Sequence, residues 1–128
     1  MRIRFYRPHG LRHVRTASGR NFNFYGGTFI NRGDLRKVGI EYPIKLEYYK
    51  TIPNNELLKN TNEVKYGIEV VKTSYIQDEV KIENKEMLGL TRDENIVNKI
   101  LDILKRNEVT PISAGYVIED LLKEMIKE

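Results

Sequence analysis

The sequence predicts a small α+β protein, in which two C-terminal α-helices pack on one face of an antiparallel β-sheet. Apolar and polar residues alternate from residue 64 and again after residue 79, which predicts a β-hairpin over about 64–88. Two amphipathic segments follow, at about 92–106 and 111–127, with apolar residues three and four positions apart. Because a two-stranded ribbon alone is marginal in water, the hairpin needs such helices to pack on.

The predicted hairpin has a clear reversal. Gln77-Asp78-Glu79 is the expected turn, and Val80 and Ile82 begin the returning strand. An earlier strand over 42–52 is predicted by Ile44, Leu46 and Tyr48, which alternate with polar residues. Residues 43–128 are therefore expected to form one compact α+β domain.

The ends of the two helices carry their own signals. Thr91 and Glu94 have the spacing of a capping box, and Lys105 and Arg106 complement the negative end of the first helix dipole. Pro111 after Thr110 suits the first position of the second helix, where its missing N–H costs no hydrogen bond.

Charge is distributed unevenly along the 128 residues. The net charge is +4, but the first 40 residues hold nine basic residues and one acid, whereas the remainder is acidic. The chain has no cysteine, which excludes disulfides and thiolate–zinc sites. It shows no signal peptide and no apolar run long enough for a bilayer, so a cytoplasmic location without membrane contact is expected.

Residues 1–42 combine arginine with aromatic side chains. They are expected either to be poorly ordered or to form a short hairpin that turns at Gly26-Gly27. Arginine pairs with phosphate and aromatic rings stack on bases, so this segment is a candidate nucleic-acid site. Its candidate residues are Arg2, Arg4, Arg7, Arg12, Arg15, Arg20, Phe22, Phe24 and Tyr25. The compositional break near residue 40 also raises the hypothesis that this part does not belong to the native protein. It would then be an upstream extension that results from a wrongly chosen translation start.

No arrangement of residues predicts catalysis, a cofactor or a metal site. His9 and His13 stand among proline, glycine and arginine rather than on a helix, with no third ligand nearby. The carboxylate pairs Asp93-Glu94 and Glu119-Asp120 are explained by helix capping and solvation. The serines and threonines of the 43–128 part lack an activating histidine. We therefore expect the protein not to be an enzyme.

Three segments resemble a family of small proteins from clostridial and related Firmicutes genomes, classed as a domain of unknown function. They are residues 65–72 (KYGIEVVK), 107–112 (NEVTPI) and 116–122 (YVIEDLL), and the resemblance covers about residues 44–123. It implies a hairpin followed by two helices, and no assigned activity, ligand or catalytic residue. Gly115 departs from the pattern, since a larger side chain is expected there.

The sequence thus favours a non-enzymatic binding or regulatory module that acts through protein contacts. The partner is an unknown protein or a second copy of the chain, because a small sheet leaves edges and one face available. The alternative is a nucleic-acid-binding protein that uses the arginine-rich segment.

Overall fold

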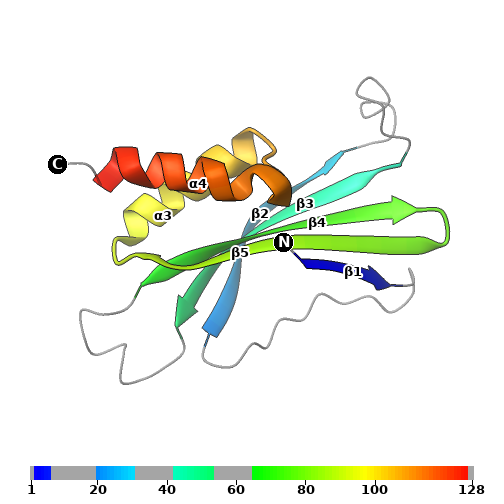
Figure 1. The fold of residues 1–128 in the computed structure, drawn as a ribbon, viewed down its shortest axis with the longest axis horizontal. Helices are drawn as coiled ribbons and strands as arrows, with labels where there is room; N and C mark the ends of the chain where they lie inside the picture. Colours follow the sequence, from blue (N-terminus) through cyan, green and yellow to red (C-terminus); the bar gives the residue numbers. More distant parts are fainter. Residues whose placement is uncertain (1, 7–19, 31–41, 54–64, 127–128) are drawn as a thin grey trace.

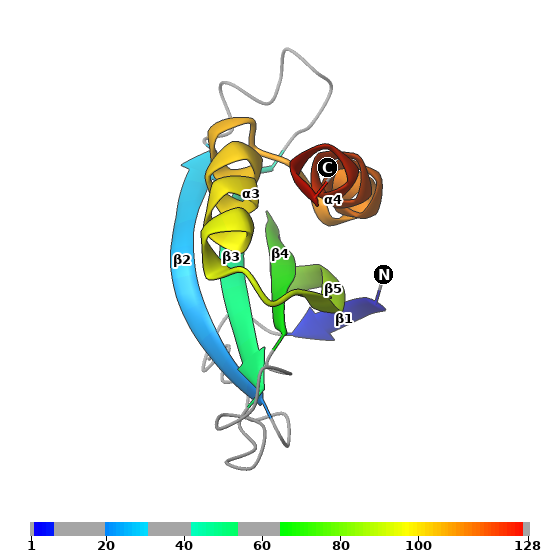
Figure 2. The ribbon, with the colours of Figure 1, turned by 90° about the vertical axis from the view of Figure 1, so that its left-hand side faces the viewer.

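The expected α+β architecture is confirmed by the structure, a computed structural model that describes residues 2–6, 20–30, 42–53 and 65–126. Five strands form one antiparallel sheet in the order β1-β5-β4-β3-β2, and two helices pack on one of its faces (Figures 1 and 2). The elements are β1 (Arg2–Tyr6), β2 (Arg20–Ile30), β3 (Ile44–Pro53), β4 (Tyr66–Ile76), β5 (Glu79–Thr91), α3 (Glu94–Arg106) and α4 (Pro111–Ile126).

The predicted hairpin consists of β4 and β5. The chain reverses at Gln77 and Asp78, and Gln77 adopts the left-handed conformation with φ of 48°. The returning strand is longer than the sequence suggested and ends at Thr91. Strand β3 pairs with the other side of β4, as in the register Tyr48↔Val70, so β4 lies at the centre of the sheet.

The two N-terminal strands occupy opposite edges of this sheet. Strand β1 pairs with β5 and β2 pairs with β3 over its whole length. The prediction of a turn at Gly26-Gly27 is wrong, because β2 runs without interruption from Arg20 to Ile30. The glycines serve close packing instead: a Cβ on Gly27 would lie 2.7 Å from the Leu46 carbonyl oxygen. A bulge between Phe24 and Gly26 interrupts the register.

The main core lies between the sheet and the helices. One face of β3 and β4 contributes Ile44, Leu46, Tyr48, Ile68 and Val70, and the helices contribute Val97, Ile100, Leu101, Leu104, Ala114 and Ile118. The buried Tyr48 hydroxyl donates a 2.8 Å hydrogen bond to the Val109 carbonyl oxygen. This bond ties the sheet to the link between α3 and α4.

Helix α3 begins two residues later than the capping-box spacing suggested. Thr91 is the last residue of β5, and its hydroxyl accepts a 3.1 Å hydrogen bond from the Asp93 amide. The N-cap is Asp93, whose Oδ1 accepts a 2.9 Å bond from the Asn95 amide. Thr91 therefore shapes the strand-to-helix corner, while Asp93 satisfies a free amide of the helix.

We expect Asp93→Ala to lower the free energy of unfolding by about 1 kcal/mol, because the Asn95 amide loses its acceptor. Asp93→Asn keeps an oxygen at the same position and should retain most of that stability. Urea denaturation of the two variants and the parent chain measures the difference. Equal losses in both variants would show that the carboxylate charge, not the capping bond, stabilises the helix.

Candidate protein-binding surface

Helix α4 exposes large apolar side chains on the side that does not face the core. Ala114 and Ile118 are buried against the rest of the domain. In contrast, Ile112 is 67% exposed, Tyr116 is 77% exposed and Ile126 is 47% exposed. An exposed tyrosine beside exposed isoleucines is typical of a surface that contacts another protein.

These side chains belong to one row along the helix. Ile112, Tyr116, Glu119, Lys123 and Ile126 are separated by four, three, four and three positions, so they lie on one side of α4. We call this set the outer row. Apolar residues occupy both ends of the row, and one acid and one base occupy its middle.

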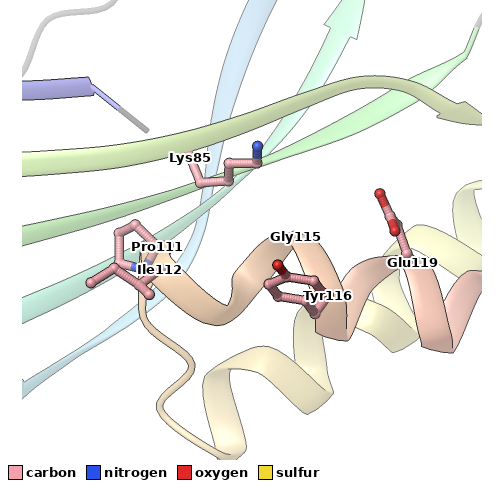
Figure 3. Close-up of a pocket in the computed structure, with 6 residues that line it drawn as sticks. All are labelled: Lys85, Pro111, Ile112, Gly115, Tyr116 and Glu119. Carbon is pink, nitrogen blue, oxygen red and sulfur yellow. The ribbon is translucent and has the colours of Figure 1, made fainter.

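A hollow of about 410 Å³ lies between the N-terminal half of α4 and strand β5 (Figure 3). Its lining residues are Lys85, Pro111, Ile112, Gly115, Tyr116 and Glu119. Lys85 projects from β5 toward the helix, and the helix contributes the other five residues. Gly115 opens this hollow, since a Cβ there would come within 3.4 Å of the Lys85 Cε.

A second hollow, of about 460 Å³, continues along the C-terminal half of α4. It is lined by Glu119, Leu122, Lys123 and Ile126. Glu119 belongs to both hollows, so together they follow the outer row from one end of the helix to the other. The surface can therefore receive side chains at two places, each beside an apolar end of the row.

The sheet face opposite the helices has a different character. It carries a smaller apolar cluster of Tyr49, Val71, Val80 and Ile82. Exposed Phe24 stacks edge-on against Tyr49 with ring centroids 5.6 Å apart. Phe29, also exposed, lies 6.1 Å from the ring of Tyr75. Aromatic rings are thus available on this face near its β2 edge.

The carboxylates of Glu47, Glu69 and Glu86 lie toward the middle of the same face. Glu69 is fully buried and pairs in register with Glu86 on the neighbouring strand. The Asn84 amide donates a 2.7 Å hydrogen bond to Glu69, and Glu47 accepts a 2.9 Å bond from the Tyr49 hydroxyl. Glu47 also lies 3.7 Å from the Lys45 Nζ, so carboxylates of this face are paired with polar and basic neighbours within the sheet.

The structure does not bring the predicted nucleic-acid residues together as one patch. Arg2 and Arg4 lie on β1 and Arg20 lies on β2, at opposite edges with three strands between them. Phe22 and Phe24 pair in register with Thr51 and Tyr49 across the open face.

Tyr25, the last of the set, points to the helix side. Its hydroxyl donates to the Asp102 carboxylate at 2.6 Å. Arg7, Arg12, Arg15, His9 and His13 lie outside the described residues.

The carboxylates of the helices have structural surroundings. Asp93 caps α3, and Glu94 pairs with Lys50 of β3 at 2.6 Å. Asp120 and Glu119 are exposed on α4, and Glu119 lines the two hollows. Across the described ranges, no three histidine, cysteine, aspartate or glutamate side chains are grouped so as to hold a metal ion.

The architecture is that of a small α+β domain whose sheet is covered on one face by two consecutive helices. Residues 36–124 match a family of unknown function, DUF6514, and the chain belongs to this family. The segments that carried the resemblance in the sequence lie within the matched range. No curated protein and no solved structure gave a significant match.

The sequence patterns did not single out the outer row. The recurrence of apolar residues three and four positions apart does not distinguish Ile126, which the structure leaves half exposed, from the partly buried Leu121 and Met125. The signal was available in the spacing: Ile112, Tyr116 and Ile126 share a side of the helix that differs from the side of Ala114 and Ile118.

Proposed function

We propose that the chain is a non-enzymatic module that binds the helix of a protein partner along α4. The observation that carries this proposal is the outer row, with its exposed Ile112, Tyr116 and Ile126 and its two hollows. Such a surface suits an amphipathic helix, whose contacting side chains are spaced three and four residues apart.

The charges of the row add specificity to this contact. Glu119 and Lys123 lie between the apolar ends and would each select a residue of opposite sign on the partner. The apolar contacts supply most of the affinity, and Tyr116 is the best anchor because it buries a large ring with few rotatable bonds.

Nucleic-acid binding by the N-terminal arginines is the second candidate. It is favoured by the exposed rings of Phe24 and Phe29, on which bases can stack. It has less support, since Arg2 and Arg4 lie on β1, at the edge of the sheet opposite to the β2 strand that carries these rings. Neither α3 nor α4 is long and apolar enough to cross a membrane.

The test is site-specific photo-crosslinking in the full-length chain. A photoreactive aromatic residue in place of Tyr116 should give one discrete, saturable protein adduct, and the adduct should disappear when Ile112→Asp is added. The same probe at Lys99, an exposed position on α3, is the matched control and should give no such adduct.

Three results would contradict the proposal. These are identical adducts from both positions, no adduct from position 116, or an adduct that nuclease treatment removes. The last result would favour the nucleic-acid candidate, which also predicts absorbance at 260 nm that is lost at high salt.

A further inference from the structure

The outer row has an internal symmetry that points to its partner. From Tyr116 to Ile126 the row reads apolar, acidic, basic, apolar, at positions 116, 119, 123 and 126. These positions are symmetric about residue 121: Glu119 and Lys123 lie two residues from it, and Tyr116 and Ile126 lie five residues from it. A helix of the same sequence running in the opposite direction therefore presents a complementary residue at each of these four positions: an apolar residue faces an apolar one, and an acid faces a base.

We infer that the partner is a second copy of this chain, bound by antiparallel pairing of the two α4 helices about a twofold axis that passes between Glu119 and Lys123, level with residue 121. The inference deepens the proposed function, on which it rests. In this arrangement Glu119 meets Lys123 of the second copy, and Lys123 meets its Glu119. Tyr116 packs against Ile126 of the second copy at both ends of the contact.

The charges at the centre of the row are free to form these pairs. Within the parts of the chain that the structure describes, Glu119 and Lys123 make neither an ion pair nor a side-chain hydrogen bond. Two opposite charges that are exposed and unpaired, and that lie on the same face, fit a partner with the same two charges in reverse order.

The hollows match the same register. The hollow lined by Leu122, Lys123 and Ile126 lies where Tyr116 of the second copy arrives. The hollow beside Tyr116, between α4 and β5, lies where the second copy's Ile126 arrives (Figure 3). Each copy thus offers one receiving hollow and one inserted side chain at each end, as a twofold contact requires.

The size of the contact sets the expected strength. A helix of 16 residues is about 24 Å long, and a single helix pair buries less than the roughly 1,200–2,000 Å² of a stable interface. We therefore expect a weak dimer, with a dissociation constant on the order of 10 µM or higher.

Sedimentation equilibrium of the full chain between about 1 µM and 1 mM tests the inference. Glu119→Lys and Lys123→Glu, each alone, place like charges together twice per dimer and should weaken association at least about tenfold. The double variant restores both pairs and should return association to within about threefold of the parent chain. An equimolar mixture of the two single variants should form a heterodimer more tightly than either variant pairs with itself.

Glu124→Lys is the matched control, because it makes the same charge change on α4 away from the outer row. It should leave association unchanged, and circular dichroism should show all variants folded, since every substituted position is exposed. A chain that stays monomeric to 1 mM, single reversals without effect, or a double variant no better than the singles would each overturn the inference.

The outcome also separates this inference from the proposed function. If crosslinking at position 116 captures a different protein while the purified chain is monomeric, the binding surface stands and the self-association fails. If the adduct has twice the mass of the chain and the charge reversals behave as expected, both hold. Failure of the crosslink together with an unchanged dimer in every variant would remove both.

Discussion

Replacing Gly67 by alanine is expected to lower the free energy of unfolding by about 3 kcal/mol or more, the largest effect we expect from adding a methyl group to any glycine that the structure describes. Gly67 lies in the central strand β4, beside a bulge between Tyr66 and Ile68. A Cβ at this position would lie 2.4 Å from the Thr51 hydroxyl oxygen and 2.5 Å from the Met87 carbonyl oxygen. The strand on each side would have to move.

Gly115→Ala is the matched control for this substitution. A Cβ at Gly115 meets only the flexible end of Lys85, at 3.4 Å, and alanine is the better helix former by about 1 kcal/mol. The same chemical change should therefore stabilise the protein at Gly115 and destabilise it at Gly67. Urea or thermal denaturation of both variants shows directly whether each substitution raises or lowers the free energy of unfolding.

A second variant separates the two contacts of Gly67. Thr51→Ala removes the hydroxyl but leaves the Met87 carbonyl, so it should relieve only part of the damage in the Gly67→Ala background. Complete recovery in the double variant would place the whole clash at Thr51. A Gly67→Ala protein as stable as the parent would show that β4 and β5 can separate at the bulge without cost.

The elements that the sequence predicted well are those with agreeing local signals. Helix α3 combines an apolar stripe, acidic residues at its start and Lys105-Arg106 at its end, and it spans Glu94–Arg106 where about 92–106 was expected. The hairpin was recognisable from its period-two alternation. In both cases residues within one turn or one strand carry the information, so no knowledge of distant contacts is needed.

The N-terminal strands show the limit of local reasoning. Nothing near Arg2 or Ile3 indicates that this segment pairs with β5, some 80 positions along the chain, as the register Arg2↔Asn84 shows. Gly26-Gly27 was interpreted as a turn because glycine tolerates turn geometry, whereas here it lets β2 approach β3 closely. A glycine pair supports both structures, and only the partner strand decides between them.

The candidate surface was missed for a similar reason. The apolar residues of α4 cover more than one side of the helix, and the sequence alone does not say which side faces the sheet. Ala114 and Ile118 become the buried side only because β4, β5 and α3 lie against them. Once that side is known, the exposure of Ile112, Tyr116 and Ile126 has no explanation in the packing of the domain. This makes the outer row a candidate binding surface.

Raising the pH above about 10 is expected to destabilise the protein steeply, chiefly through Tyr48. Burial, and to a smaller extent the negative charge of Glu108, raise the pKa of the Tyr48 phenol well above its usual value of 10. The folded state therefore holds the neutral phenol, which donates to the Val109 carbonyl, while the unfolded state ionises from about pH 10 upward. Stability is complete below pH 10 and falls by about 1.4 kcal/mol per pH unit above it.

Tyr48→Phe tests this dependence. At pH 7 the variant should be about 1 kcal/mol less stable, because the Val109 carbonyl loses its donor. Since phenylalanine does not ionise, the stability deficit of the variant relative to the parent chain should shrink above pH 10 and vanish at about pH 11. Urea denaturation from pH 8 to 11.5 measures both curves.

Tyr25→Phe serves as the comparison. A hydrogen bond to Asp102, then burial and the charge of Asp102, raise the pKa of Tyr25 to about 12. Because this side chain is only partly buried, solvent screens its interactions. Replacing Tyr25 by phenylalanine should therefore reduce the loss of stability above pH 10 less than replacing Tyr48 does. Parallel curves for the parent and the Tyr48→Phe variant across this range would show that the buried phenol does not control alkaline unfolding.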